Sequence, residues 1–404
     1  MTPLMSLFNK KTISKTIALA APPDAARLAV LQEWAETIRS GAISSQKETA
    51  LHGNFKQKIL VEVLGYSDFN QSGAWTVDVE AQIGAGSVDL ALGHFDANSR
   101  TIIAPFELKG AKTRNLDAIM PGRAKSPVDQ AWEYATNNVG TKWVLVSNYL
   151  EIRLYSYGEG RQFHEVFDLA KLHEPAEYQR FTLLLSAENL LGGRTAELLD
   201  ESRRENKDIT NRLYADYKVL RQDLIGAVQM ARPDMNALHA IRMGQTILDR
   251  ILFIAFAEDT SLLPPKTLEK AFENSDPYNP KPVWQNFLGL FRAIDEGSAT
   301  LGIPRYNGGL FKRDGEIIDL SIPDHICEGF KRLSEYDFAS EISVTVLGHI
   351  FEQSIADVEQ LQAEARGDAP PPKKTSGTSG RRKRDGVVYT PDYIARFIDR
   401  RAHV

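Results

Sequence analysis

The feature that most constrains the fold is a change of hydrophobic pattern near residue 176. Before this point, helix-like stretches alternate with strand-like runs at 86–95, 101–109, 142–148 and 151–157. Beyond it the strand pattern nearly disappears, and long amphipathic runs such as NRLYADYKVLRQDLIGAVQ take over. A period of two indicates strands and a period near 3.6 indicates helices. We therefore expect an α/β domain followed by an all-helical domain.

Helices are expected on both sides of the predicted strands. Apolar side chains recur at helical spacing in 23–40, 46–64 and 126–138. The last of these helices has Ser126 as its N-cap, with Pro127 and Asp129 in its first turn, which is typical of a capping box. Residues 43–175 are therefore predicted to form one domain. Residues 1–42 are predicted to be a loose leader followed by a helix.

The remainder of the chain divides into three predicted parts. Residues 176–363 should form the helical domain, and a new element should begin in 386–404. Between them, 364–385 is rich in Pro, Gly, Ser and basic residues, which predicts a disordered linker. Two interpretations of its basic cluster stay open, contact with DNA phosphates or solvation of the linker. This cluster comprises Arg381, Arg382, Lys383 and Arg384.

Composition excludes some classes of protein. No run of eighteen apolar residues occurs in the chain, so we expect no membrane span. Cys327 is the only cysteine, which excludes an internal disulfide and, together with the first expectation, favours a cytoplasmic protein. The net charge of −5 does not exclude a nucleic-acid partner, because phosphates respond to a local positive groove.

The residues that carry chemistry lie on two neighbouring predicted strands. In GSVDLALGHFD, Asp89 alternates with apolar side chains, and in RTIIAPFELKGAK a period of two places Glu107 and Lys109 on one face. If the two strands pair as a hairpin, these three side chains can converge at its open end. Unpaired buried charge is costly, so this arrangement indicates a function.

Two carboxylates and an amine at this spacing suit metal-assisted hydrolysis of a phosphodiester. Asp89 and Glu107 would hold Mg²⁺ through hard oxygen ligands, and the metal would activate a water molecule. Lys109 would stabilise the transition state electrostatically. The alternative is a salt bridge on the surface of a sheet edge. A second Glu-x-Lys, Glu205 to Lys207, lies in a polar run without a strand pattern, and we assign no function to it.

The helix predicted after these strands adds a further candidate. Gln130 and Tyr134 lie one turn apart on one face, where an amide and a phenol could orient the attacking water or contact a phosphate. The alternative is an ordinary helix surface. Glu48, at the start of an earlier helix, is either an additional metal ligand or a favourable partner of the helix dipole.

Residues 43–173 resemble the nuclease domain of fused type II (IIG and IIL) restriction-modification enzymes. The resemblance rests on KETALHGNF, SVDLAL, FELKG, SPVDQAWEYA and WVLVSNYLEIRLYS. It implies a PD-(D/E)XK core, with Asp89 as the aspartate, Glu107 as the second acid and Lys109 as the lysine. Gln130 matches a glutamine often found after this core. Asp89 is preceded by valine instead of the proline of the pattern.

The later part of the chain resembles other regions of the same fusions. FAEDTSLLP, YNGGLF and LGHIFEQSI resemble the helical connector, and GVVYTPDYIARFI resembles the opening motif of an N6-adenine DNA methyltransferase. This implies that Tyr389, Thr390 and Pro391 approach S-adenosylmethionine. No Asn/Asp-Pro-Pro-Tyr/Phe motif occurs in the chain, so we expect the rest of the methyltransferase and the target-recognition domain in a longer form of the protein.

The sequence therefore predicts the endonuclease part of a bifunctional restriction-modification protein. Its predicted partner is double-stranded DNA, its cofactor is Mg²⁺, and S-adenosylmethionine would serve the full-length form only. The alternative is a DNA-binding or scaffold region of an adenine methyltransferase that does not cleave. Intact Asp89, Glu107 and Lys109 favour the nuclease over this alternative.

Overall fold

The computed structural model describes residues 6–46, 48–69, 73–84, 86–120, 122–306 and 308–338, together with residues 361, 363 and 366. The chain divides into two compact units, one from Thr2 to Glu205 and one from Asn206 onward. The predicted linker 364–385, apart from Arg366, and the predicted methyltransferase element 386–404 lie outside the described residues.

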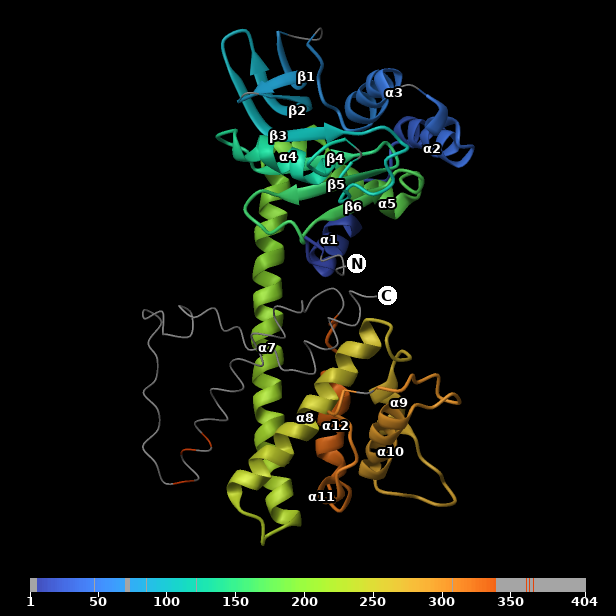
Figure 1. The fold of residues 1–404 in the computed structure, drawn as a ribbon, viewed down its shortest axis with the longest axis vertical. Coiled ribbons are helices and arrows are strands. Elements are labelled where there is room, and N and C mark those ends of the chain that lie inside the picture. Colours follow the sequence, from blue (N-terminus) through green and yellow to red (C-terminus); the bar gives the residue numbers. More distant parts are fainter. Residues whose placement is uncertain are drawn as a thin grey trace. The chain divides into compact units, whose positions relative to one another are not determined.

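A mixed six-stranded sheet forms the centre of the first unit (Figure 1). Its strands follow the chain in the order β1 to β6, and the pairing of β3 with β4 is parallel while every other pairing is antiparallel. The strands are β1 (Ala74–Ile83), β2 (Gly86–Asp96), β3 (Arg100–Leu108), β4 (Trp143–Ser147), β5 (Glu151–Ser156) and β6 (Glu165–Asp168). The four predicted strands and the hairpin of β2 and β3 are confirmed, and the fold of this unit is α/β.

Strands β1 and β6 are not among the four strands predicted from the sequence. In β1 a bulge lies between Trp75 and Val77, and Glu80 adopts a positive φ of 50°. The apolar residues of β1 nevertheless recur at every second position from Trp75 to Ile83, so the sequence carries a strand pattern here that the prediction left out. Strand β6 has only four residues, which is too short to show a period.

Helices precede the sheet, cover it and follow it in the first unit (Figure 1). The predicted helices 23–40 and 126–138 are confirmed as α2 and α4, and 46–64 forms an α-helix that continues as a π-helix. The helices are α1 (Lys10–Ala18), α2 (Ala25–Arg39), the 3₁₀-helix η1 (Ala42–Ser45), α3 (Glu48–Phe55), the π-helix η2 (Lys56–Val63), α4 (Pro127–Thr136), α5 (Pro175–Leu185) and α6 (Ala187–Gly192).

The prediction of a loose N-terminal leader is wrong for its described part. Leu7, Phe8 and Ile13 are buried in the same core as the sheet. Glu165 of β6 holds this segment, because its Oε1 accepts hydrogen bonds from the backbone N–H groups of Leu7 (2.9 Å) and Phe8 (3.1 Å). Arg180 donates to the other oxygen of Glu165 at 2.9 Å. The sequence pattern missed these contacts because the partners of the segment lie more than 150 residues away.

The two faces of the sheet have different cores. Phe106, Leu108 and Leu145 pack on one face with residues of α2, α3 and η2. On the other face, Val144 and Val146 pack against α4. Side chains alternate between faces along a strand, so Glu107, between Phe106 and Leu108, lies on the α4 face. Its neighbour on β4 is Val146.

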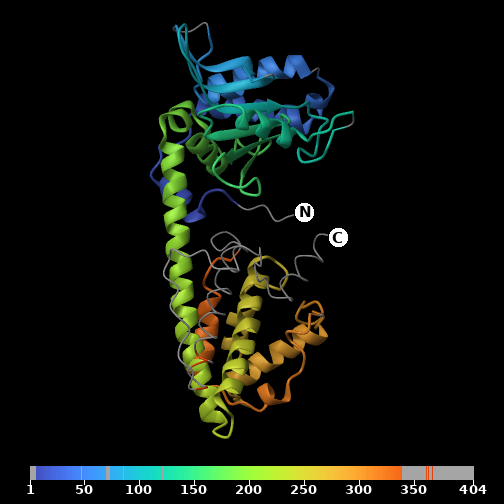
Figure 2. The same cartoon turned by 60° about the vertical axis from the view of Figure 1, so that its left-hand side comes forward.

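The second unit is built from helices around one hydrophobic core (Figure 2). Among its described residues, only an isolated bridge between Ser298 and Ile303 has β-type pairing. Cys327 is completely buried there, and burial raises the pKa of its thiol to about 12. The helices are α7 (Arg194–Ala231), which begins in the first unit, α8 (Ala237–Asp259), α9 (Thr267–Glu273), α10 (Val283–Glu296), α11 (Gly315–Ile318) and α12 (Asp324–Leu333).

Among the described residues, no helix combines the length and the apolar composition needed to cross a bilayer.

Candidate functional site

The hairpin of β2 and β3 places Asp89 opposite Glu107. Leu90 pairs with Phe106 in the antiparallel register, so Asp89 and Glu107 occupy the next opposed position. The Oδ2 atom of Asp89 accepts a hydrogen bond of 2.7 Å from the backbone N–H of Leu108. Lys109 directly follows the last residue of β3, and its backbone N–H donates to the carbonyl of Ser147 on β4 at 2.9 Å. Backbone contacts on both sides therefore fix the positions of all three predicted residues.

Glu107 is the most buried of the three, with 1% of its surface exposed. Its Oε1 contacts the Lys109 ammonium, whereas its Oε2 is buried and has no hydrogen-bond partner. Burial, reinforced by the negative charge of Asp89, raises the pKa of Glu107 to about 7. Lys109 opposes this shift without cancelling it. Glu107 therefore carries a proton more readily than an ordinary glutamate does.

Lys109 lies between the two acids. Its side chain is 9% exposed, and its Nζ contacts Glu107 and lies 4.0 Å from Oδ2 of Asp89. Of these three residues, only Asp89 is open to solvent, with 37% of its side chain exposed. An ordinary surface salt bridge has both partners in water, so this cluster differs from the surface interpretation. Glu205 and Lys207, the other Glu-x-Lys, lie in helix α7 and not in a strand.

Helix α4 presents Gln130 and Tyr134 at the start of β2. The Gln130 amide lies 3.4 Å from the Tyr134 hydroxyl, as their spacing predicts. A Cβ at Gly86 would lie 3.0 Å from the ring of Tyr134, so this ring packs directly on the first residue of β2. The capping box of Ser126 and Asp129 is present and begins the helix at Pro127. The amide and phenol thus lie on the same face of the sheet as Glu107.

Arg123 was not predicted and belongs to the same cluster. Its guanidinium donates to Oε1 of Gln130 at 3.4 Å, and its positive charge lowers the pKa of Glu107 against the stronger effect of burial. The sequence signal for this residue is weak, because one arginine in a basic loop does not show which carboxylate it approaches.

Other predicted residues are not placed in the site. Glu48 begins α3, but its side chain is not among those described. The predicted S-adenosylmethionine contacts, Tyr389, Thr390 and Pro391, lie outside the described residues, as does the basic cluster 381–384.

The donor atoms fit a magnesium ion that keeps most of its water. Mg²⁺ is commonly held by one or two carboxylates together with water and substrate phosphates. Asp89 and Glu107 supply two such groups, and the unpartnered Oε2 of Glu107 has an unused acceptor. Among the described residues, no group of three or more His, Cys, Asp and Glu side chains is arranged to hold a metal. Among the described side chains, Asp89 and Glu107 would therefore be the carboxylates that hold magnesium here.

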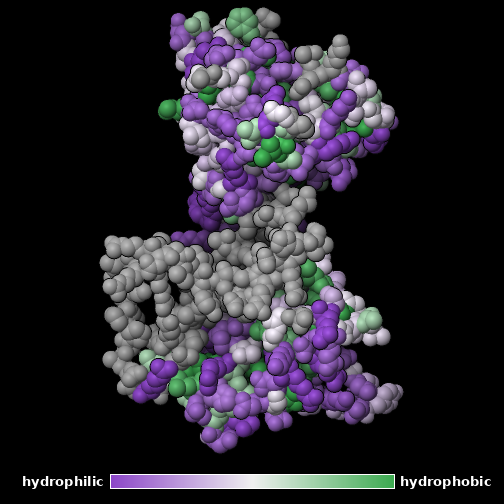
Figure 3. Space-filling view, viewed as in Figure 1, coloured by the Kyte–Doolittle hydropathy of each residue, from purple (hydrophilic) through white to green (hydrophobic). Residues whose placement is uncertain are grey.

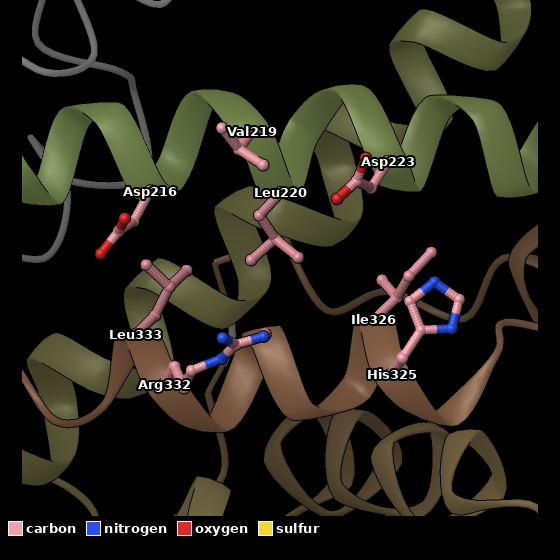
Figure 4. Close-up of a pocket in the computed structure, with 9 residues that line it drawn as sticks. Asp216, Val219, Leu220, Asp223, His325, Ile326, Arg332 and Leu333 are labelled. Carbon is pink, nitrogen blue, oxygen red and sulfur yellow. The ribbon is translucent and has the colours of Figure 1, made fainter.

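The cavities of the second unit have a different character. A groove of about 250 Å³ lies between α7 and α12, where Asp216 and Asp223 face His325 and Arg332 (Figure 4). The hydroxyl of Tyr336 donates to Asp216 at 2.6 Å, and a Cβ on Gly329 would overlap Leu220. The side chains that line this groove therefore belong to the packing of α7 against α12. A wider cavity of about 990 Å³ beside α9 and α10 is lined by mixed polar and apolar side chains.

Comparisons with known proteins do not assign this chain to a family. No protein family matches the chain, and no curated protein matches it. Among solved structures, the chain is similar to a cryoEM structure of a DrdV–DNA complex, with 15% sequence identity and a TM-score of 0.24. The match covers 84% of this chain and 29% of that one, so this chain spans less than a third of the other's length. A similarity at this TM-score does not define a fold, so the function is argued from the site.

Proposed function

We propose that the first unit is a Mg²⁺-dependent endonuclease of the PD-(D/E)XK type that cleaves double-stranded DNA at specific sites. One observation carries the proposal: two carboxylates and a lysine converge on the α4 face, and the buried Glu107 has an oxygen without a partner. A divalent cation between Asp89 and Glu107 would relieve both the repulsion and the missing contact. The resemblance of 43–173 to restriction-modification nucleases supports the same activity.

Each side chain has a distinct role in this proposal. Asp89, the exposed acid, and Glu107, the buried acid, would hold the metal, which supplies an activated water and screens the charge on the phosphate. Lys109 places its Nζ between the two acids and would stabilise the negative charge that develops on the reacting phosphate. Gln130 presents an amide on the same face of the sheet and would orient the attacking water.

The first test replaces Asp89. Asp89→Asn keeps an oxygen that can accept from the Leu108 N–H but removes the charge that binds a cation. We expect it to abolish Mg²⁺-dependent cleavage of plasmid DNA and to leave the unfolding temperature nearly unchanged. Asp168→Asn is the matched control, because Asp168 ends β6 and its Oδ1 also accepts one backbone N–H, at 3.0 Å. Full cleavage by purified Asp89→Asn would refute the role of Asp89.

The second test separates catalysis from DNA binding at Lys109. Lys109→Met keeps the buried aliphatic stem and removes the ammonium group. A charge that acts on the transition state contributes to turnover, so we expect near-normal DNA affinity in Ca²⁺ and cleavage in Mg²⁺ about a hundredfold slower. Weakened binding with a normal single-turnover rate would instead make Lys109 a docking residue and favour the DNA-binding alternative.

The methyltransferase proposal rests only on the resemblance of 386–404. We propose that a longer form of the protein methylates adenine with S-adenosylmethionine and thereby protects the sites that the nuclease cuts. The 404-residue chain is expected to bind S-adenosylmethionine weakly or not at all, because neither a Gly-rich cofactor loop nor the catalytic Asn/Asp-Pro-Pro-Tyr/Phe motif follows Tyr389–Thr390–Pro391 in it. Micromolar binding in a calorimetric titration would contradict this expectation.

A further inference from the structure

The loop between β3 and α4, residues 110–125, is strongly basic. It carries the exposed side chains of Lys112, Arg114, Arg123 and Lys125. Asp117 is its only acid, so the loop has a net charge of +3 in a chain whose net charge is −5. The loop is therefore a local positive region in an acidic protein, and local potential is what attracts a polyanion.

Two of these cations form no ion pair with the described residues. Arg123 contacts Gln130, and Lys125 forms an ion pair of 2.6 Å with Glu133. Lys112 and Arg114 form no ion pair in the described part of the chain, and they follow Lys109 by three and five residues. Their positive charges are available to a partner.

The loop is nevertheless held in place at several points. Leu116 is completely buried against α4, and the carbonyl of Thr113 accepts a hydrogen bond of 2.9 Å from the Asn148 amide. Arg153 of β5 donates to Asp117 at 2.8 Å. Lys112 and Arg114 therefore project from a fixed backbone, and fixing a binding loop beforehand lowers the entropy lost on association.

Both limbs of the loop adjoin the acidic site. The first limb begins at Gly110, directly after Lys109, and the teal segment leaves the sheet at the end of β3 (Figure 2). The second limb carries Arg123, whose charge acts on Glu107. A strand of nucleic acid with one phosphate at Asp89 and Glu107 would therefore meet the basic loop at the adjacent phosphates.

The charge of the loop favours a polyanion over a protein partner. On the face seen in Figure 3, the first unit is mainly hydrophilic, and its hydrophobic residues are scattered in small groups. Protein interfaces have an apolar centre, whereas duplex DNA presents about one charge per 1.7 Å of its axis. We propose that the loop 110–125 binds the DNA backbone. Lys112 and Arg114 would each contact a phosphate beside the one that is cleaved. This inference rests on the proposed function of the site.

The test measures the salt dependence of DNA binding by the full 404-residue chain. Fluorescence anisotropy with a labelled duplex in Ca²⁺ would compare the chain with Lys112→Ala/Arg114→Ala. Each lost phosphate contact lowers the slope of log affinity against log salt by about one. We expect a slope lower by about two and an affinity roughly tenfold weaker at moderate salt. The same affinity and slope as the unaltered chain would overturn the proposal.

Two further variants make the result specific. Lys10→Ala/Lys15→Ala removes the same charge from exposed positions on α1, and its slope should match that of the unaltered chain. Lys112→Arg/Arg114→Lys keeps both charges and should restore binding. An equal loss in the α1 variant would show that net charge alone acts, which would refute the loop as the binding element.

The proposal for the loop and the proposal for the nuclease can be refuted independently of each other. Cleavage in Mg²⁺ together with loop variants that bind normally would refute the loop and leave the nuclease standing. Loop-dependent binding without cleavage in Mg²⁺ or Mn²⁺ would support the loop and refute the nuclease.

Discussion

Glu107 is the residue at which burial and charge conflict most strongly. Its pKa of about 7 means that folding favours the protonated form between its ordinary pKa of 4.5 and neutrality. In this range the folded state binds more protons than the unfolded state, so the free energy of unfolding falls as pH rises. The stability that the neutral carboxyl contributes is complete below pH 4.5 and is lost by the time the pH has passed 7.

Glu107→Gln should remove this pH dependence. Without metal, the variant is expected to be more stable than the unaltered chain at pH 8, by about 1 to 3 kcal/mol, and similar to it near pH 4.5. Urea unfolding followed by tryptophan fluorescence would measure the difference. Glu36→Gln, at an exposed position of α2, is the control. A variant less stable than the unaltered chain at pH 8 would show that the ionised Glu107 stabilises the fold.

The positive charge of Arg123 should influence the pKa of Glu107. Its charge lowers the pKa of Glu107, so Arg123→Gln is expected to move the pKa above about 7. NMR titration of the carboxyl carbon of Glu107 in metal-free protein would measure the shift. Lys125→Gln is the matched control in the same loop, because Lys125 pairs with Glu133 instead. A pKa that falls in Arg123→Gln would contradict the electrostatic role.

The residues of the site differ in how far the sequence predicts them. Asp89, Glu107 and Lys109 could be placed together because a strand has a period of two and a hairpin opposes its strands. Arg123 could not be placed in the site from the sequence, because its position near Glu107 depends on how Leu116 and Asp117 hold the loop. Those contacts join segments distant in sequence, and local pattern does not report them.

At the scale of elements, a bulge in the β2–β3 hairpin depends on one glycine. The register shifts between Leu92 and Gly93, and a Cβ on Gly93 would overlap the carbonyl oxygen of Thr101. The neighbouring atom is backbone, so no side chain can rotate to make room.

Gly93→Ala should therefore destabilise the first unit severely, by about 3 kcal/mol or more. The control is Gly226→Ala in α7, where a Cβ would meet no atom within 4 Å. Alanine favours helix over glycine by about 1 kcal/mol, so the control should be neutral or stabilising. Thermal unfolding would compare the two variants, and equal stability of Gly93→Ala and the unaltered chain would show that the bulge tolerates a side chain.

The elements that the prediction left out were left out for different reasons. Strand β1 has apolar residues at every second position from Trp75 to Ile83 and was predictable from its pattern, whereas helix α1 is recognised only through its contacts with the sheet unit. The predicted elements have regular periods over most of their length. Hydrophobic period is thus a reliable signal where an element is regular, and tertiary contacts decide where it is not.

At the scale of the whole molecule, each unit has its own hydrophobic core. Leu248 of α8 is completely buried in the helical core. Leu248→Ala should destabilise that unit by about 2 to 5 kcal/mol. Hydrogen exchange should show lost protection in α8 with little change in β2 and β3. Equal loss in both units would mean that they unfold together.

The hydrogen bond from Leu108 to Asp89 has a consequence for how the hairpin can be altered. It fixes the register of β2 and β3 at the open end of the hairpin. The turn at the other end is closed by Asp96, whose Oδ1 accepts hydrogen bonds from the backbone N–H groups of Asn98 (2.7 Å) and Ser99 (2.8 Å). The bulge at Gly93 separates the two ends. A peptide tag or reporter inserted at Asn98 should therefore leave the two acids opposed, which makes this turn a suitable attachment point for a probe that must not disturb the chemistry.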